Sequence, residues 1–250
     1  MYRVSPIVKQ LLIINIIFFV GSTLSFNSDF IYSLFSLYFP ENPQFKFWQI
    51  ITHMFMHGNI QHILFNMFAL WMFGSSVESI FGAKKFLFFY ITCGLGAAFI
   101  QILFLYYVFY SNLDLLVSSG YDQSSILNIL AEGKYNTSWE GVLGPKGLLD
   151  FNSSFFSSMV GASGAIMGVL VAFGMFFPDS KLMLIFLPVP IKAKYFIPGI
   201  ILLDLFSAIT GQAIFSPSNT AYVAHIGGAL TGFLIMYYWK KNQFTKNRWY

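Results

Sequence analysis

The sequence predicts an all-α membrane protein: a bundle of six transmembrane helices with both termini cytoplasmic. Of its 250 residues, 56% are hydrophobic and only 10% are charged, whereas a soluble domain carries about 25% charged residues. The charged residues are also clustered, so that they leave long uncharged runs between them. Each run is a candidate to cross a hydrocarbon core about 30 Å thick, which takes about 20 apolar residues.

The uncharged runs define the six predicted spans. The first run is too long for the core of a signal peptide and lacks a small-residue cleavage site, so we expect it to stay in the protein. We interpret residues 1–250 as a single transmembrane domain. The predicted spans are residues 9–27, 59–77, 86–109, 162–177, 194–212 and 222–239.

The positive charges give the orientation. With six crossings, the outer side holds only Lys46, Lys134 and Lys146. The excess of Lys and Arg on the other side marks it as cytoplasmic, including the tail 240–250. The net charge of +4 then reflects topology, and we expect a multi-pass protein of the cell inner (plasma) membrane with no nucleic-acid partner. The cytoplasmic set is Arg3, Lys9, Lys84, Lys85, Lys181, Lys192, Lys194, Lys240, Lys241, Lys246 and Arg248.

Three connecting segments differ in character. Residues 28–58 are aromatic and contain prolines, which is typical of a segment lying at the outer interface. Residues 110–158 are rich in Ser, Asn and Gly, and we expect a long polar outer loop there. Residues 182–190 are apolar but are interrupted by two prolines, so we expect them at the inner interface rather than across the bilayer.

Few polar residues lie inside the predicted spans. His62 and Asn66 are four residues apart, so they share one helix face. Ser163 opens the fourth span and His225 lies near the outer end of the sixth. At a rise of 1.5 Å per residue, Ser163 and His225 each lie roughly 21 Å above the inner boundary, and Asn66 roughly 18 Å. Three helices therefore carry polar groups at a similar depth.

Small residues allow two of these helices to approach closely. Gly164 and Gly168 form one G-x-x-x-G pattern, and Gly228 and Gly232 form another. Such patterns let helix backbones pack tightly in lipid. Close packing of the fourth and sixth helices would bring Ser163 within reach of His225.

This set of residues suits nucleophilic catalysis. A serine becomes an effective nucleophile when a histidine takes its proton, so Ser163 is the candidate nucleophile and His225 the candidate base. His62, Asn66 and the backbone N–H of Ser163 are candidate donors to an oxyanion. No acidic residue is obviously placed to orient His225, so we expect a dyad rather than a triad.

The motifs resemble those of the rhomboid intramembrane serine proteases. They are His57-x4-His62-x3-Asn66, Gly161-Ala162-Ser163-Gly164 and Ala224-His225-x-Gly227-Gly228-x3-Gly232, and the resemblance covers roughly residues 5–240. It implies a rhomboid-like bundle of the basic bacterial type. It also implies hydrolysis of peptide bonds in or beside transmembrane segments of membrane-protein substrates, without a cofactor.

Two positions depart from the family pattern. Many members have Trp-Arg in the first outer loop, whereas this chain has Trp48-Gln49. Many also carry a tyrosine four residues after the serine, which stacks on the base, whereas this chain has Met167. The first difference concerns the folding of the loop, and the second concerns the orientation of His225.

Other interpretations remain for single residues. Ser163 is also a suitable helix N-cap. His53 and His57 have the spacing of metal ligands, but no carboxylate is near and His62 points about 140° away from His57, so we expect no metal. We expect Glu78 to make an anchoring hydrogen bond, Asp204 to be structural or unassigned, and Cys93 to be inert.

Two other functions compete with proteolysis. The first is a non-catalytic rhomboid-like protein that binds membrane clients, which would lack the serine and histidine pair that this chain has. The second is a transporter of small solutes or metals that uses the histidines. Such folds typically contain inverted repeats, and this sequence shows none.

Overall fold

The computed structural model describes residues 4–184, 187–212 and 221–243. These residues are mostly helical, and four of the helices are long and apolar enough to cross a membrane: Pro6–Leu24, Ile60–Phe81, Ala83–Ser118 and Ala193–Thr210. The helices are α1 (Pro6–Leu24), α2 (Ser28–Phe35), α3 (Gln49–Thr52), η1 (His53–Phe55), α4 (Ile60–Ala69), η2 (Leu70–Gly74), α5 (Ser75–Phe81), α6 (Ala83–Ser118), α7 (Gln123–Ala131), η3 (Thr137–Trp139), α8 (Glu140–Phe156), α9 (Ser163–Phe176), α10 (Ala193–Thr210) and α11 (Tyr222–Gln243).

The first turn of α1 is held by Glu78 of α5. The two carboxylate oxygens of Glu78 accept hydrogen bonds from the backbone N–H groups of Ile7 (3.0 Å) and Val8 (2.9 Å), and from the Ser5 hydroxyl. A carboxylate is favourable there because the first N–H groups of a helix lack partners within it. Glu78 therefore has the anchoring role expected from the sequence.

The second predicted span is one helical rod of 22 residues, from Ile60 to Phe81. Asn59 caps its start, since its side-chain oxygen accepts a hydrogen bond from the backbone N–H of His62 at 2.8 Å. A π-helical turn, η2, interrupts the α-helical geometry at Leu70–Gly74. This turn packs against α9, the central helix of the bundle.

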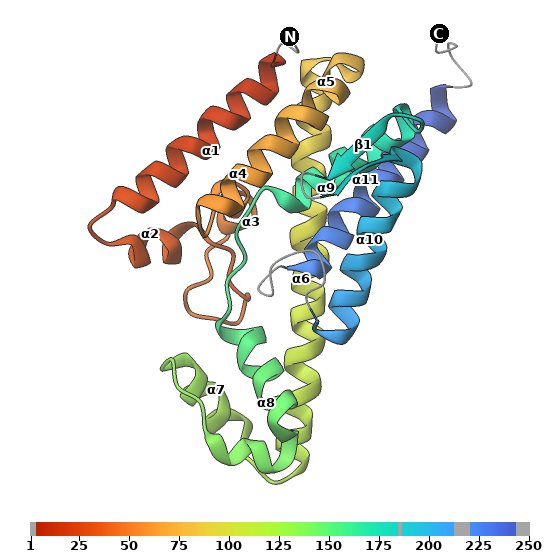
Figure 1. Ribbon diagram of the computed structural model, residues 1–250. Helices are drawn as coiled ribbons and strands as arrows, with labels where there is room; N and C mark the ends of the chain where they lie inside the picture. Colours follow the sequence, from red (N-terminus) through yellow and green to blue (C-terminus); the bar gives the residue numbers. More distant parts are fainter. Residues whose placement is uncertain (1–3, 185–186, 213–220, 244–250) are drawn as a thin grey trace.

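The prediction of a polar loop over residues 110–158 was wrong, because most of this segment is helical. Helix α6 has 36 residues and is therefore about 54 Å long, well beyond a hydrocarbon core of about 30 Å. Its far half carries α7 and α8, at the end of the molecule opposite the start of α1 and the end of α11 (Figure 1).

These outer helices enclose a second hydrophobic core, which we call the outer cluster. It joins α6, α7 and α8 to the loop before α3, and its largest side chains are fully buried. Helix α8 bends at Gly144, where a positive φ of 69° precedes Pro145. The members of the outer cluster are Phe39, Phe109, Leu113, Leu116, Ile126, Leu130, Trp139, Leu148, Phe151 and Phe155.

Residues 181–192 contain a β-hairpin, so the prediction of an all-α fold was wrong at this point. Strand β1 (Lys181–Leu184) pairs antiparallel with β2 (Leu187–Lys192), and Lys181 lies opposite Lys192. Both strands are edges of a two-stranded sheet, and edge strands tolerate the prolines that a central strand excludes.

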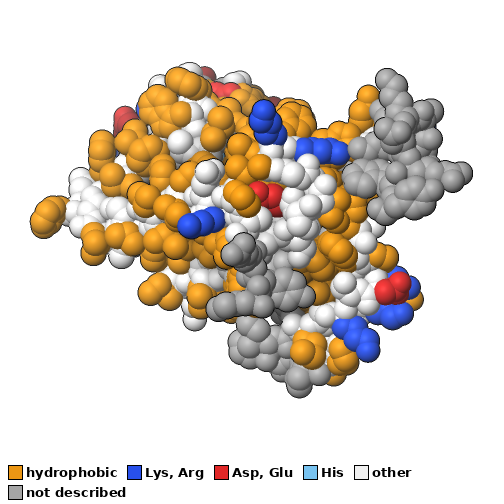
Figure 2. All heavy atoms as spheres, turned by 90° about the horizontal axis from the view of Figure 1, so that it is seen from above, with side chains coloured by type: hydrophobic (Ala, Val, Ile, Leu, Met, Phe, Trp, Pro, Cys, Tyr) orange, Lys and Arg blue, Asp and Glu red, His pale blue; other side chains and the backbone are white. Residues whose placement is uncertain are grey.

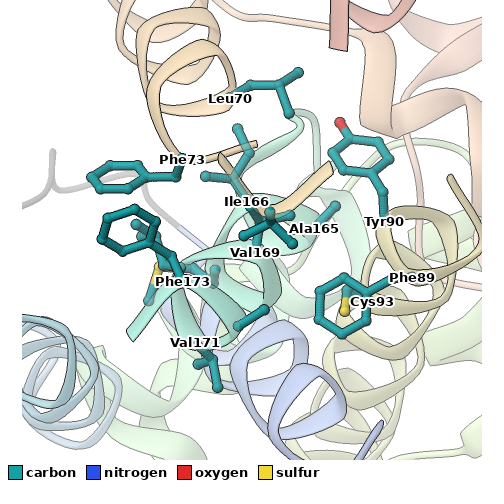
Figure 3. Packing of buried hydrophobic residues seen from close by; sticks show 14 of the residues in the cluster. Leu70, Phe73, Phe89, Tyr90, Cys93, Ala165, Ile166, Val169, Val171 and Phe173 are labelled. Carbon is teal, nitrogen blue, oxygen red and sulfur yellow. The ribbon is translucent and has the colours of Figure 1, made fainter. Parts of the chain in front are cut away.

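Helix α9 lies at the centre of the bundle. Every residue from Gly164 to Phe173 is buried, and the helix packs against α6, α10, α11 and η2. Figure 3 shows its Val169 between side chains of η2 and α6, and its Phe173 beside Phe73 of η2. The rings of Phe73 and Phe173 meet edge to face, 4.9 Å apart. Such a helix holds its first residue, Ser163, in a fixed place.

The start of α1 and the end of α11 lie at the same end of the molecule (Figure 1). Figure 2 views this end and shows Lys side chains spread over it among hydrophobic ones. Three of the cations assigned to the cytoplasmic side, Arg3, Lys246 and Arg248, lie outside the described residues.

Candidate active site

Ser163 and His225 meet as the sequence predicts. The hydroxyl oxygen of Ser163, the first residue of α9, lies 2.8 Å from Nε2 of His225 in the first turn of α11. Both side chains are only partly buried. The N-cap of α9 is Ala162, and it makes no side-chain capping bond. Ser163 is therefore not simply a helix cap, since its hydroxyl contacts the histidine.

Glycines of α11 make this approach possible. A Cβ atom on Gly228 would overlap the carbonyl oxygen of Gly164, and one on Gly232 would lie 2.6 Å from Cα of Gly168. On α9, Gly168 allows close contact with a different helix, because a Cβ atom there would collide with Cys93 of α6. The two G-x-x-x-G patterns therefore allow α6, α9 and α11 to pack tightly against one another.

The other ring nitrogen of His225 contacts an acid, which the sequence analysis did not anticipate. Nδ1 of His225 lies 2.9 Å from Oδ2 of Asp204, a residue of α10 that is only 3% exposed. The expectation that no acid is placed to orient His225 was therefore wrong, and Asp204, which we expected to be structural or unassigned, contacts the candidate base. A single apolar helix with one acid does not reveal which neighbour that acid faces.

His62 and Asn66 lie on one face of α4. A long hydrogen bond of 3.5 Å runs from the backbone N–H of Gly58 to Nδ1 of His62. A nitrogen that accepts has no proton, so the proton of the neutral ring is on Nε2. Asn66 is 7% exposed, and its side-chain nitrogen has no hydrogen-bond partner among the described residues.

Gly161 brings this face close to Ser163. A Cβ on Gly161 would lie 2.7 Å from Nε2 of His62 and 3.5 Å from the hydroxyl oxygen of Ser163. Its φ of +123° is also one that residues with a side chain rarely adopt. Its N–H donates to the carbonyl oxygen of His53 at 2.9 Å. Only glycine keeps the space between His62 and Ser163 open.

His53 and His57 are buried beside the site. Nδ1 of His53 lies 2.8 Å from the carbonyl oxygen of Gln49. Burial lowers the pKa of His53 to about 4, and burial together with the nearby His62 lowers that of His57 to about 4. Within the part of the chain that the structure describes, no three His, Cys, Asp or Glu side chains gather around a common point.

Gln49 holds the first outer loop together at the position where the family pattern differs. Its side-chain nitrogen donates to the carbonyl oxygens of Ser33 (2.9 Å) and Gln44 (3.0 Å). Its side-chain oxygen accepts from the backbone N–H groups of Lys46 (3.1 Å) and Tyr38 (3.3 Å). The amide therefore satisfies four backbone groups of the loop, and the loop contact is made without an arginine.

The arrangement is suited to one kind of chemistry. A serine hydroxyl faces a ring nitrogen that can take its proton, and His62 of α4 lies across a glycine from that hydroxyl. These are the parts that acyl transfer through a serine requires. Their elements are α4, α9 and α11, three segments far apart in sequence.

Comparison with known proteins gives a match to one family. The family model described as "Rhomboid domain" matches residues 44–122 and 123–242. The human presenilin-associated rhomboid-like protein, mitochondrial, is 28% identical over 214 residues, which are 82% of this chain and 43% of that protein.

Two further relatives come from other organisms. Rhomboid protein 1, mitochondrial, of Saccharomyces cerevisiae is 26% identical over 192 residues, 77% of this chain and 42% of the relative. Rhomboid protease AarA of Providencia stuartii is 29% identical over 197 residues, 75% of this chain and 54% of the relative. The matched region is thus about half the length of each relative, or less.

Proposed function

Since this chain belongs to the rhomboid family, we propose that it is an intramembrane serine endopeptidase. It hydrolyses peptide bonds in or next to transmembrane segments of membrane-protein substrates. The observation that carries the proposal is the contact of 2.8 Å between the hydroxyl oxygen of Ser163 and Nε2 of His225. The name of the Providencia stuartii relative, a rhomboid protease, adds support.

The reaction begins with proton transfer. His225 takes the hydroxyl proton of Ser163 on Nε2 while the oxygen attacks the carbonyl carbon of the scissile peptide bond. The tetrahedral intermediate collapses, the C–N bond breaks, and His225 returns its proton to the leaving amine. Water then attacks the acyl-enzyme, with His225 again as the base, and releases the new carboxyl end of the substrate.

The negative oxygen of the tetrahedral intermediate is stabilised by three N–H groups. They are the protonated Nε2 of His62, the side-chain amide of Asn66 and the backbone N–H of Ser163 at the start of α9. The side-chain nitrogen of Asn66, which has no partner among the residues that the structure describes, supports this role, because a buried donor is costly unless a ligand satisfies it. Gly161 leaves space for the substrate carbonyl between His62 and Ser163.

In the membrane, we propose that six helical segments form a single rhomboid-like transmembrane domain. The four long apolar helices, the shorter apolar α9 and α11 supply the crossings. Both termini then face the cytoplasm. This orientation agrees with the position of the start of α1 and the end of α11 at one end of the molecule, and with the lysines at that end (Figures 1 and 2). The lipid bilayer is the solvent of this bundle.

We place the protein in the plasma membrane of its cell, with transmembrane proteins as its substrates. The name of the human relative places it in mitochondria, whereas the name of the Providencia stuartii relative gives no location. Cell fractionation is therefore the direct test. Recovery of the protein in an organelle rather than in the plasma membrane would refute this placement. The proteolytic proposal does not depend on it.

Purified protein with a single-span model substrate tests the proteolytic proposal. The wild type should cleave the substrate, and Ser163→Ala should abolish cleavage. A fluorophosphonate probe should label Ser163 in the wild type and fail to label His225→Ala. Equal cleavage by Ser163→Ala and the wild type would refute the proposal. A chain that binds the substrate without any cleavage would instead be a rhomboid-like binding protein.

A further inference from the structure

Asp204 is the acidic residue of α10, a helix that is otherwise apolar along most of its length. Burial of an ionised carboxylate in such surroundings is costly unless a partner compensates it. Acids within membrane helices are therefore rare, and they usually serve a function. Asp204 is 3% exposed, and Oδ2 lies 2.9 Å from Nδ1 of His225.

This contact determines which nitrogen of His225 carries the proton. An ionised carboxylate can only accept hydrogen bonds, so the proton between the two groups belongs to Nδ1 of His225. Nε2 of the neutral ring then has a free electron pair, which faces the Ser163 hydroxyl at 2.8 Å. In the opposite tautomer Nε2 would carry the proton, and His225 could not take another from Ser163.

A second contact joins the same two helices. The side chains of Ser207 and Tyr222 lie close enough to interact. Ser207 is three residues after Asp204 on α10, and Tyr222 is three residues before His225 on α11. Residues three apart lie on the same helix face, so the two ties fix the rotation of α10 against α11. Asp204 is thus held facing His225.

Other residues near the serine do not provide this function. Neither α9 nor α11 contains an acidic residue. Met167, one turn after Ser163, is buried in the hydrophobic cluster around α9 and its thioether is a weak acceptor. The orientation of His225 therefore depends on a helix that contributes neither the nucleophile nor the oxyanion donors.

We infer that Asp204 is a positioning residue, which holds His225 in the tautomer and orientation that accept the proton of Ser163. This inference rests on the proposed proteolytic function. The serine proton moves to Nε2, and the carboxylate, which accepts from Nδ1, stabilises the positive ring that forms. The site is then a Ser163–His225–Asp204 relay spread over α9, α11 and α10.

The first test is kinetic. Asp204→Asn in the purified full-length protein should lower kcat for a model transmembrane substrate by about 100-fold or more, since an asparagine can donate to Nδ1 and so favour the wrong tautomer. KM should stay within about twofold, because Asp204 touches no substrate. Asp204→Glu restores a carboxylate and should recover about tenfold or more of the lost kcat.

Glu78→Gln is the matched control. Glu78 is also a carboxylate with 3% exposure, but it caps α1 at the other end of the bundle. Its loss should lower the thermal midpoint and leave kcat of the folded protein within about twofold. If Asp204→Asn had the kcat of the wild type in an assay in which Ser163→Ala is inactive, the inference would be overturned and the proteolytic function would stand. Activity of Ser163→Ala would overturn the function instead.

A spectroscopic test is independent of activity. A proton shared between Nδ1 of a histidine and a carboxylate resonates at unusually low field in the proton NMR spectrum. The signal should be present in the wild type and in Ser163→Ala, and absent in His225→Ala. Its absence in Ser163→Ala would overturn the inference, even if Asp204→Asn failed to fold.

Discussion

A Cβ atom on Gly228 of α11 would overlap the carbonyl oxygen of Gly164 on α9, so the two helix backbones are in direct contact. His225 lies one turn from Gly228, and Ser163 is the neighbour of Gly164. The distance between the reacting groups is therefore set by a contact between two glycines, and this relationship leads to the first prediction.

Gly228→Ala should separate α11 from α9. Overpacking of a tight contact costs about 1–3 kcal/mol of stability, and His225 should move away from Ser163 with its helix. We expect a lower thermal midpoint and a decrease of kcat/KM of about tenfold or more, measured on the purified protein. Gly21→Ala is the control, because a Cβ there has open space and alanine favours helix by up to about 1 kcal/mol. Equal behaviour of the two variants would contradict this account.

Asn66→Ala should slow the chemical step. Removal of one oxyanion donor typically lowers kcat by about 100- to 1,000-fold, and the fold should persist because the lost nitrogen has no partner among the described residues. Steady-state kinetics should show the decrease in kcat with KM nearly unchanged. Asn15→Ala removes another buried asparagine, in α1, and should keep wild-type kcat. A similar loss in both variants would indicate a structural effect instead.

Gln49→Ala should destabilise the first outer loop. The substitution leaves four backbone groups without the partners that the amide now provides, and each buried unsatisfied group costs about 1–3 kcal/mol. We expect a lower thermal midpoint and faster cleavage of residues 28–58 by an added protease. Gln123→Ala, at an exposed position in α7, should change neither. An unchanged protease pattern in Gln49→Ala would argue against this role.

Acidification should destabilise the protein already at pH values above those at which ordinary carboxylates titrate. The pKa values of His53 and His57 are lowered to about 4 by burial, whereas an unfolded histidine has a pKa of about 6.5. Below that value the unfolded chain binds protons that the folded chain does not, so stability is lost as pH falls. Between pH 7 and 5 each histidine accounts for up to about 2 kcal/mol.

The measurement is the thermal midpoint as a function of pH. His53→Gln keeps a donor near the Gln49 carbonyl oxygen but does not titrate, so its midpoint should fall less than that of the wild type between pH 7 and 5. Identical pH dependence in the two proteins would show that the buried histidines do not cause the effect.

The sequence could predict the contact of Ser163 and His225 because two local signals coincide. The uncharged runs define helices, and the rise per residue gives a depth for each polar side chain. The glycines then identify which faces approach most closely. Each of these signals can be read from one segment at a time.

Asp204 could not be placed in this way. Its helix is apolar on all sides, so hydropathy allows any rotation about the helix axis, and no glycine pattern marks the face toward α11. The helices of residues 110–158 were missed for a related reason. Their polar surfaces hide the outer cluster, which forms only when Phe39 and Phe109 come from elsewhere in the chain. The hairpin at residues 181–192 likewise depends on pairing between strands, which single-segment hydropathy does not reveal.

The length of α6 means that this protein is stabilised in two different solvents. Lipid tails are as apolar as leucine, so the bundle depends on close fit, as at Gly228 and Gly164. The outer cluster lies on the far half of α6, beyond a core of about 30 Å, and it depends on the exclusion of water. Urea or cooling should loosen α7 and α8 first, whereas a change of lipid or detergent should act on the bundle. One helix therefore links two regions whose stabilities can be changed separately.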